Sequence, residues 1–410
     1  MRVSDAVKTS FNFAHYRKQL RTNCVYRAVN PARYLLDRVR TKLADGGARS
    51  TFDGYRTTKV LLVSDTLAWN SEQQFNPFSL YRTELRDKLK LIALHLLLRD
   101  VLRSPNLILR SFDVVILKMS FETNTKQALD IVRSIKGALN GQRLIYFDGD
   151  DDLCVQWPEI LPYVDLYVKK HLFHDRNQYL KQFVGKSNLT DFVHQRYNYS
   201  FSDNPIATET RPLPIEQLSK LSIGSNLALD LNIVELYRQL QLRPDRSAKE
   251  HDIVFRGSVP NDWMYYLRKD IAPALGRLGD RYRIILPANR VPIEEYYREM
   301  ESSRICVSPF GYGEICWRDF EAVLCGCLVI KPDMNHVETN PDIFKPYQTY
   351  VPVQWDFSDL EEKCSYYLEH DDERRRIAER AFNVLDEFYK TDGGMKALDN
   401  LMRHCLEVRK

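Results

Sequence analysis

The chain has 410 residues, of which 44% are hydrophobic and 28% charged, and its 59 Lys and Arg against 55 Asp and Glu give a formal net charge of +4. This length predicts two or three domains, and the composition excludes collagen-like, low-complexity and wholly disordered proteins. Because a dedicated nucleic-acid-binding protein usually has a stronger basic bias, we expect no nucleic-acid partner.

The N-terminal segment differs from the rest of the chain in charge. Residues 1–58 carry twelve Lys or Arg and four Asp. We therefore expect residues 1–55 to form a basic helical arm, which either packs on the first domain or contacts an anionic membrane surface or acceptor. The polar start has no signal-peptide pattern, and no apolar run approaches the ~20 residues of a membrane span. We expect a cytoplasmic protein, peripheral at most to the inner face of a membrane.

Strands and helices alternate from residue 56 onward. Apolar strands are predicted at 59–63, 112–117, 143–147 and 164–168, with an amphipathic helix at 125–139. The apolar run at 91–98 is interpreted as a core helix. This alternation is typical of a parallel sheet with helices on both faces, which we assign to residues 56–245.

A second α/β pattern follows. Strands are predicted at 252–256, 282–286, 304–308 and 327–330, with helices at 263–278, 293–302, 318–324 and 358–389. We assign residues 246–385 to this domain and residues 386–410 to a last helix that packs back on the first. The predicted fold is α/β, with two Rossmann-like domains facing across a cleft that is the expected active site.

The most informative stretch lies at residues 308–330. A strand leads into a loop that contains Gly311, Tyr312, Gly313 and Glu314, and a helix begins near residue 317. Glycines let a backbone approach a ligand closely, and free amides at a helix start favour an anion such as a diphosphate. Arg318 adds charge-assisted donors in the first turn. Glu321 lies on the same helix face and has the carboxylate to accept from ribose hydroxyls.

The run R-D-F-E-A-V-L-C-G-C-L-V-I from Arg318 resembles the donor-nucleotide element of GT-B glycosyltransferases, in the style of exostosin-type and CgeB-like (family 1-like) enzymes. The resemblance implies that Arg318 approaches the donor diphosphate and that Glu321 holds the donor ribose. Many retaining GT-B enzymes have two Glu with seven residues between them. Glu314 and Glu321 have six, so no catalytic role is transferred to Glu314.

Two further loops of the second domain are candidate parts of the donor site. Arg256 and Gly257 follow its first strand, and Arg256 is a candidate diphosphate contact, with a surface ion pair as the alternative. Asn289 follows the next predicted strand and is a candidate contact of the nucleotide base.

An acidic loop, Asp148-Gly-Asp-Asp-Asp152, follows a predicted strand of the first domain. Asp148 and Asp150 are candidate general bases for an acceptor hydroxyl. The loop also resembles the D-x-D metal motif of GT-A glycosyltransferases, whose carboxylates suit Mg²⁺ or Mn²⁺. The alternative is a solvated acidic turn. Asp65, after the first strand, is a third candidate base.

These patterns predict a glycosyltransferase that moves a sugar from a nucleotide-diphosphate donor to a hydroxyl of a glycan, lipid-linked or anionic acceptor, as in polysaccharide biosynthesis. No metal or other cofactor is expected to be required. Two alternatives remain open: a metal-dependent transferase that uses Asp148, Asp150 and Asp152, and a non-catalytic nucleotide-sugar-binding protein.

Overall fold

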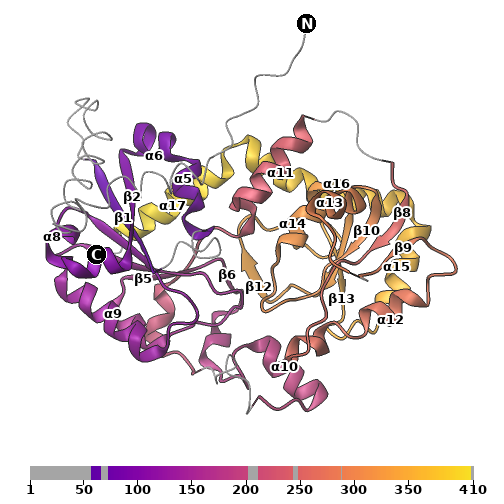
Figure 1. Cartoon of the computed structure of the whole chain (residues 1–410), viewed down its shortest axis with the longest axis horizontal. Coiled ribbons are helices and arrows are strands. Elements are labelled where there is room, and N and C mark those ends of the chain that lie inside the picture. The colour runs from indigo at the N-terminus through magenta and orange to yellow at the C-terminus, as the bar shows by residue number, and fades with distance from the viewer. Residues whose placement is uncertain (1–56, 66–72, 202–210, 243–247, 288, 408–410) are drawn as a thin grey trace, which may run out of the picture.

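The computed structural model describes residues 57–65, 73–201, 211–242, 248–287 and 289–407 (Figure 1). The predicted basic arm of residues 1–55 lies outside the described residues. Among the described helices, none is both long enough and apolar enough to cross a bilayer.

The first sheet has six parallel strands in the order β2-β1-β3-β4-β5-β7. The strands are β1 (Thr58–Ser64), β2 (Leu91–Leu97), β3 (Val114–Lys118), β4 (Arg143–Asp148), β5 (Leu166–Lys169) and β7 (Leu221–Ile223). The α-helices of this part are α5 (Asn76–Leu80), α6 (Arg82–Leu89), α7 (Leu98–Arg103), α8 (Pro105–Leu109), α9 (Thr125–Ala138), α10 (Asn188–Tyr197) and α11 (Leu231–Gln241). Short 3-10 turns connect them at η1 (Gln73–Phe75), η2 (Pro158–Tyr163), η3 (Arg176–Leu180), η4 (Ile215–Lys220) and η5 (Leu227–Leu229).

The second sheet has five parallel strands in the order β13-β11-β10-β8-β9. The strands are β8 (His251–Val254), β9 (Ile284–Ile285), β10 (Ser303–Val307), β11 (Leu328–Pro332) and β13 (Val351–Val353). The remaining helices are η6 (Trp263–Leu267), α12 (Ile271–Gly276), α13 (Ile293–Glu301), α14 (Trp317–Leu324), α15 (Leu360–Glu369), α16 (Asp371–Lys390) and α17 (Gly393–Glu407).

Both sheets therefore repeat one topology, in which the first strand of the unit lies between the second and the third. In such a sheet the crossovers leave the first and third strands towards opposite faces, which opens a crevice beyond their carboxyl ends. The crevices lie between β1 and β3 in the first sheet and between β8 and β10 in the second. These two places are where ligands of parallel sheets bind. The fold prediction of two Rossmann-like domains is confirmed.

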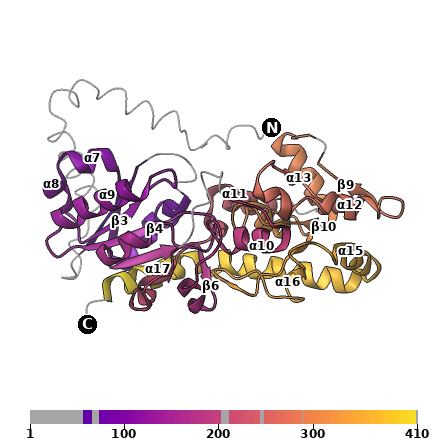
Figure 2. The same cartoon turned by 90° about the horizontal axis from the view of Figure 1, so that it is seen from below.

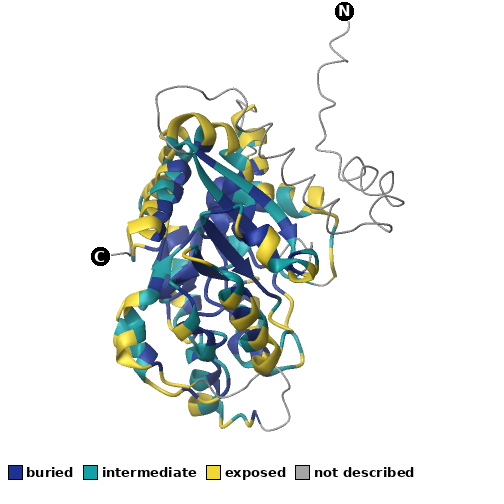
Figure 3. Ribbon diagram, turned by 90° about the vertical axis from the view of Figure 1, so that its left-hand side faces the viewer, coloured by how far each residue is buried: buried dark blue, intermediate teal, exposed yellow. Residues whose placement is uncertain are grey.

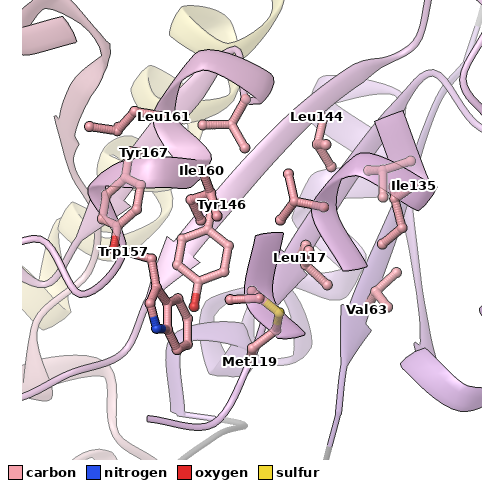
Figure 4. Close-up of a cluster of buried hydrophobic side chains, with 14 of the residues drawn as sticks. Val63, Leu117, Met119, Ile135, Leu144, Tyr146, Trp157, Ile160, Leu161 and Tyr167 are labelled. Carbon is pink, nitrogen blue, oxygen red and sulfur yellow. The ribbon is translucent and has the colours of Figure 1, made fainter. Parts of the chain in front are cut away.

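Alternating strand residues are buried on both faces of each sheet, and Figure 3 draws strands at the centre of the first domain in the dark blue of buried residues. In the first sheet, Val63 and Leu117 pack beneath α9 with the aromatic rings drawn in Figure 4. The intervening residues, such as Leu62 and Ile116, pack on the opposite face with Leu398 of α17. The last helix thus belongs to the core of the first sheet (Figure 2).

The packing divides the chain differently from the predicted boundary at 245/246. Leu189 of α10 and Ile233 of α11 belong to the hydrophobic core of the second sheet, together with Phe320 and Leu385. The apolar faces of α10 and α11 therefore pack with helices of the second domain, α10 against η6 and α11 against α14, although both helices precede the boundary in sequence. The chain crosses between the two sheets more often than the strand pattern alone indicates.

A small antiparallel ladder joins the two halves. Strand β6 (His171–Phe173) pairs with β12 (Val337–Thr339), and the two lie side by side at the centre of Figure 1. The side chain of Asn226 donates to Thr339 Oγ1 at 3.0 Å and to the Pro341 carbonyl at 3.0 Å. The relative position of the sheets is thus fixed by hydrogen bonds.

The run at 91–98 is a strand rather than the predicted helix. Residues 91–97 form β2 at the edge of the first sheet, and α7 starts at Leu98. An apolar run this short fits a buried strand or one side of a buried helix equally well, so pairing with β1 decides its conformation.

Candidate functional site

A cavity of about 390 Å³ lies where the two domains meet. Its first-domain wall carries the acidic loop 148–152 and Lys118, and its second-domain wall carries Trp263, Tyr312 and Trp317. The carboxyl ends of β3 and β4 thus face the loop between β10 and α14. This is the place that the topology of parallel sheets favours for a ligand.

The β10–α14 loop is held by a buried polar network. Asp319, in the first turn of α14, accepts from Ser308 Oγ at 2.6 Å and from the Cys316 backbone amide at 2.9 Å. Lys331 Nζ lies 3.1 Å from the same carboxylate, and Lys331 and Asp319 are fully buried. These contacts fix the start of α14, from which Arg318 projects.

Arg318 has donors that none of the described residues satisfies. Its Nη2 donates to the Arg256 carbonyl at 2.7 Å. Its Nε and Nη1 are buried and have no hydrogen-bond partner among the residues that the structure describes. Leaving buried charged donors unpaired is costly. A bound anion would satisfy them.

Arg268, which the sequence analysis missed, lies close to Arg318. This buried side chain follows η6 and donates from Nε to the Phe310 carbonyl at 2.8 Å and from Nη1 to the Ser258 carbonyl at 2.7 Å. Burial and the neighbouring Arg318 lower the pKa of Arg268 to about 10. The two guanidinium groups therefore form a positive pair bound mainly by backbone carbonyls. In the sequence, Arg268 is marked only as an arginine that follows the first strand of the second domain.

Gly311 and Gly313 are placed where side chains would interfere. A Cβ on Gly311 would lie 3.3 Å from Arg268 Nη2. A Cβ on Gly313 would lie 1.6 Å from the carbonyl oxygen of Asp151 in the first domain. The loop therefore passes close to the acidic loop and to Arg268, while the close approach to a ligand stays a prediction.

Tyr312 and Glu314, from the same loop, have different environments. Tyr312 is 46% exposed, lines the cavity and donates to Asp262 at 2.9 Å. Glu314 is fully buried and accepts from Asn188 Nδ2 at 2.8 Å. His171 and His336 lie 3.7 and 3.5 Å from its carboxylate. Although burial opposes ionisation, these imidazoles hold the pKa of Glu314 well below its usual range. Glu314 therefore joins the two domains.

Glu321 is held by two tyrosines of α13. Tyr296 donates to Oε2 at 2.6 Å and Tyr297 to Oε1 at 3.1 Å. The carboxyl group is nearly buried, and burial raises its pKa. Each oxygen retains a lone pair that remains available to a further donor.

Arg256 forms an ion pair, which the sequence analysis gave as the alternative to a diphosphate contact. Its Nε lies 2.6 Å from Glu299 Oε2, and Nη2 contacts the other carboxylate oxygen. Its Nη1 donates to the Asn289 carbonyl at 3.3 Å. Gly257 lies against the ring of Phe255, where a Cβ would approach within 2.6 Å. The Arg256 side chain is thus neutralised within the protein, while its carbonyl orients Arg318.

Lysines compensate the acidic loop. Asp148 is buried, accepts from Tyr167 at 2.6 Å and lies 2.9 Å from Lys169 Nζ. Lys186 contacts Asp150 and lies 3.0 Å from Asp152 Oδ2. Asp151 pairs with Lys170 at 2.7 Å. Each of the four carboxylates therefore has an ammonium partner in contact.

The two carboxylates that share Lys186 differ in acidity. Burial raises the pKa of Asp152 to about 7, and the nearby Asp150 adds to this increase. Burial also opposes the ionisation of Asp150, but Lys186 and Lys169 outweigh it and lower the pKa of Asp150 to about 2. Asp150 is therefore ionised at neutral pH, whereas Asp152 takes up a proton much more readily.

Asp65 lies at the crevice between β1 and β3. Its Oδ2 accepts from the Ser120 backbone amide at 2.5 Å. Its Oδ1 is buried and has no hydrogen-bond partner in the described part of the chain. Of the three predicted bases, Asp65 is the one with an unpartnered oxygen.

Residues 246–398 match a family model described as Glycosyl transferase-like. The chain is similar in structure to an α-glucosyltransferase in complex with UDP and a 13-mer DNA containing an HMU base, at 9% identity over 84% of this chain and 100% of that one, with a TM-score of 0.44. The chain is also similar in structure to a glycosyltransferase from Rickettsia africae ESF-5. The two are 10% identical over 86% of this chain and 100% of that one, with a TM-score of 0.46. No curated protein matches the chain in sequence.

The family match covers the second sheet and its helices, and the whole chain has the two Rossmann-like domains that the sequence predicts for a GT-B glycosyltransferase. The predicted enzyme class is confirmed. The closer kinship to exostosin-type and CgeB-like enzymes stays a prediction, as do the individual roles of the site residues.

Proposed function

We propose that the chain transfers a sugar from a nucleoside-diphosphate donor to a hydroxyl group of a glycan or glycolipid acceptor. The observation that carries the proposal is Arg318, whose Nε and Nη1 are buried without a partner among the described residues beside Arg268. Two guanidinium groups at the start of a helix suit a diphosphate, because each forms charge-assisted hydrogen bonds to phosphate oxygens.

In this mechanism the arginine pair stabilises the charge that develops on the leaving diphosphate. Glu321 accepts from the ribose hydroxyls with the lone pairs that Tyr296 and Tyr297 leave available. Asp65, with its unpartnered oxygen, takes the proton of the attacking acceptor hydroxyl. Asp148 serves instead to hold the cavity floor, because Tyr167 and Lys169 occupy its carboxylate.

The first prediction concerns donor binding. Arg318→Ala and Arg268→Ala each remove charge-assisted bonds, so each variant is expected to weaken nucleoside-diphosphate binding roughly 10- to 100-fold. Titration calorimetry with a panel of nucleoside diphosphates measures this. Arg277→Ala is the matched control, because Arg277 is an exposed arginine paired with Glu361. Unchanged binding in both site variants would refute the donor assignment.

The second prediction separates this mechanism from the metal-dependent alternative. Because lysines pair with the carboxylates of residues 148–152, we expect EDTA to leave donor binding and turnover unchanged. Released nucleotide, measured with and without EDTA, tests this. Loss of turnover with EDTA and its recovery with Mn²⁺ would favour the metal-dependent transferase. Donor binding without turnover in any acceptor mixture would favour a binding protein.

We also propose that the basic residues 1–55, which lie outside the described residues, contact a membrane surface. An acceptor attached to a lipid would place the cleft near an anionic surface, where a surplus of Lys and Arg is favourable. Sedimentation with anionic vesicles, with and without residues 1–55, tests this contact.

A further inference from the structure

Lys118 occupies a place in the cleft that the donor chemistry does not use. It is the last residue of β3 and lines the first-domain wall of the cavity. Strands β1 and β3 are neighbours at the crevice of the first sheet. The crevice of the second sheet, with Arg318, lies on the opposite wall. Lys118 is therefore at the ligand-binding position of the first domain.

This lysine is buried beside several carboxylates. Lys118 is 4% exposed and interacts through its charge with Asp148, Asp65 and Asp150, although no described residue lies within hydrogen-bond or ion-pair distance of its ammonium group. The carboxylates of the acidic loop are already in contact with other lysines: Asp148 with Lys169, Asp151 with Lys170, and Asp150 and Asp152 with Lys186. The other carboxylate whose charge acts on Lys118 is the proposed base, Asp65.

The acidic loop 148–152 leaves room for the ammonium end of Lys118 at Gly149. A Cβ on Gly149 would lie 2.5 Å from Lys118 Cε and 2.8 Å from Nζ, so a side chain at this position would displace the end of the lysine. Burial, and then the charge of Lys170, lower the pKa of Lys118 and outweigh the opposite effect of Asp148, Asp65 and Asp150. An anion in contact with the ammonium group would stabilise its charged form further, so the site suits a negative ligand.

We propose that Lys118 binds an oxyanion of the acceptor, a carboxylate or phosphate group that lies near the hydroxyl to be glycosylated. Phe121 and Trp157 line the same wall and offer apolar ring surface to the acceptor's sugar ring. The proposal rests on the proposed function, because it assumes that the donor diphosphate is bound across the cleft by Arg318 and Arg268. It assigns the acceptor to the anionic class.

The experiment measures a second oxyanion site while the donor site is filled. The protein is saturated with the nucleoside diphosphate that binds best, and thermal unfolding is followed as inorganic phosphate is added, with sodium chloride at matched ionic strength as reference. Wild type, Lys118→Met and Lys118→Gln are compared. Lys126→Met is the matched control, because Lys126 is an exposed lysine on α9.

We expect phosphate to raise the unfolding temperature of wild type and Lys126→Met beyond the chloride reference. In both Lys118 variants the apparent dissociation constant for phosphate is expected to rise at least about 10-fold, because one charge-assisted contact is lost. The affinity for the nucleoside diphosphate is expected to stay within about 2-fold of wild type in calorimetry.

Three results would overturn the proposal. Phosphate that fails to stabilise wild type, or that stabilises the Lys118 variants equally well, means that Lys118 holds no acceptor oxyanion. Weaker nucleoside-diphosphate binding in the Lys118 variants means that the oxyanion belongs to the donor. If the donor assignment itself is wrong, Arg318→Ala binds nucleoside diphosphate as tightly as wild type, so this failure can be told apart from failure of the Lys118 proposal.

Discussion

At the scale of single residues, His171 shows how burial sets a pH dependence. Burial lowers the pKa of His171 from its ordinary value near 6.5, so the unfolded chain takes up this proton first as the pH falls. The stability contributed by neutral His171 is present above about pH 6.5 and is lost below it, by up to about 1.4 kcal/mol per pH unit. We expect His171→Asn to remove this slope.

Urea unfolding of wild type and His171→Asn between pH 7.5 and 5.5 measures the difference. Asp152 acts in the opposite sense, because its raised pKa makes stability fall as the pH rises towards about 7. Comparing the two proteins at each pH cancels this contribution. His404→Asn, at an exposed position on α17, is the control. Parallel pH profiles for wild type and His171→Asn would contradict the prediction.

Some site residues could be predicted from the sequence and others could not, for a physical reason. Arg318 and Glu321 lie one turn apart on one helix, so their positions follow from local structure. The Glu299 that neutralises Arg256 is 43 positions away in the chain, and no local pattern connects them. Neither Lys118 nor Arg268 has a carboxylate in contact among the described residues, which only the packed structure reveals.

At the scale of elements, the two loops of the cleft meet at Gly313. Because a Cβ there would lie 1.6 Å from the Asp151 carbonyl oxygen, Gly313→Ala has to separate the β10–α14 loop from the acidic loop. We expect a loss of stability of about 1–3 kcal/mol, typical of overpacking, and a reduced turnover. Urea unfolding and nucleotide release measure the two effects.

Gly137→Ala is the matched control, since nothing lies within 4 Å of a Cβ at this position of α9. Alanine is the better helix former, so this variant is expected to be as stable as wild type or slightly more stable. If Gly313→Ala matched the control in both measurements, the two loops would not be in contact in solution.

Strands could be predicted correctly from the sequence where they are buried on both faces. The apolar runs near residues 59–63, 143–147 and 304–308 all form strands, because parallel strands covered by helices need continuous apolar sequence. The ladder between β6 and β12 had no such signal. Each of its strands has three residues, and their pairing depends on the placement of two complete sheets.

At the scale of the whole molecule, the last helix makes the first domain depend on the end of the chain. Leu398 of α17 is 1% exposed and packs against the first sheet with Val60 and Leu62. Leu398→Ala leaves a cavity there and is expected to cost about 2–5 kcal/mol. Hydrogen exchange should therefore accelerate in β1 and β3, which lie more than 250 positions earlier in the chain, while β10 and β11 keep their protection. Leu406→Ala, at a 41% exposed position of the same helix, should change neither sheet. Faster exchange confined to the second sheet would mean that α17 stabilises that domain instead.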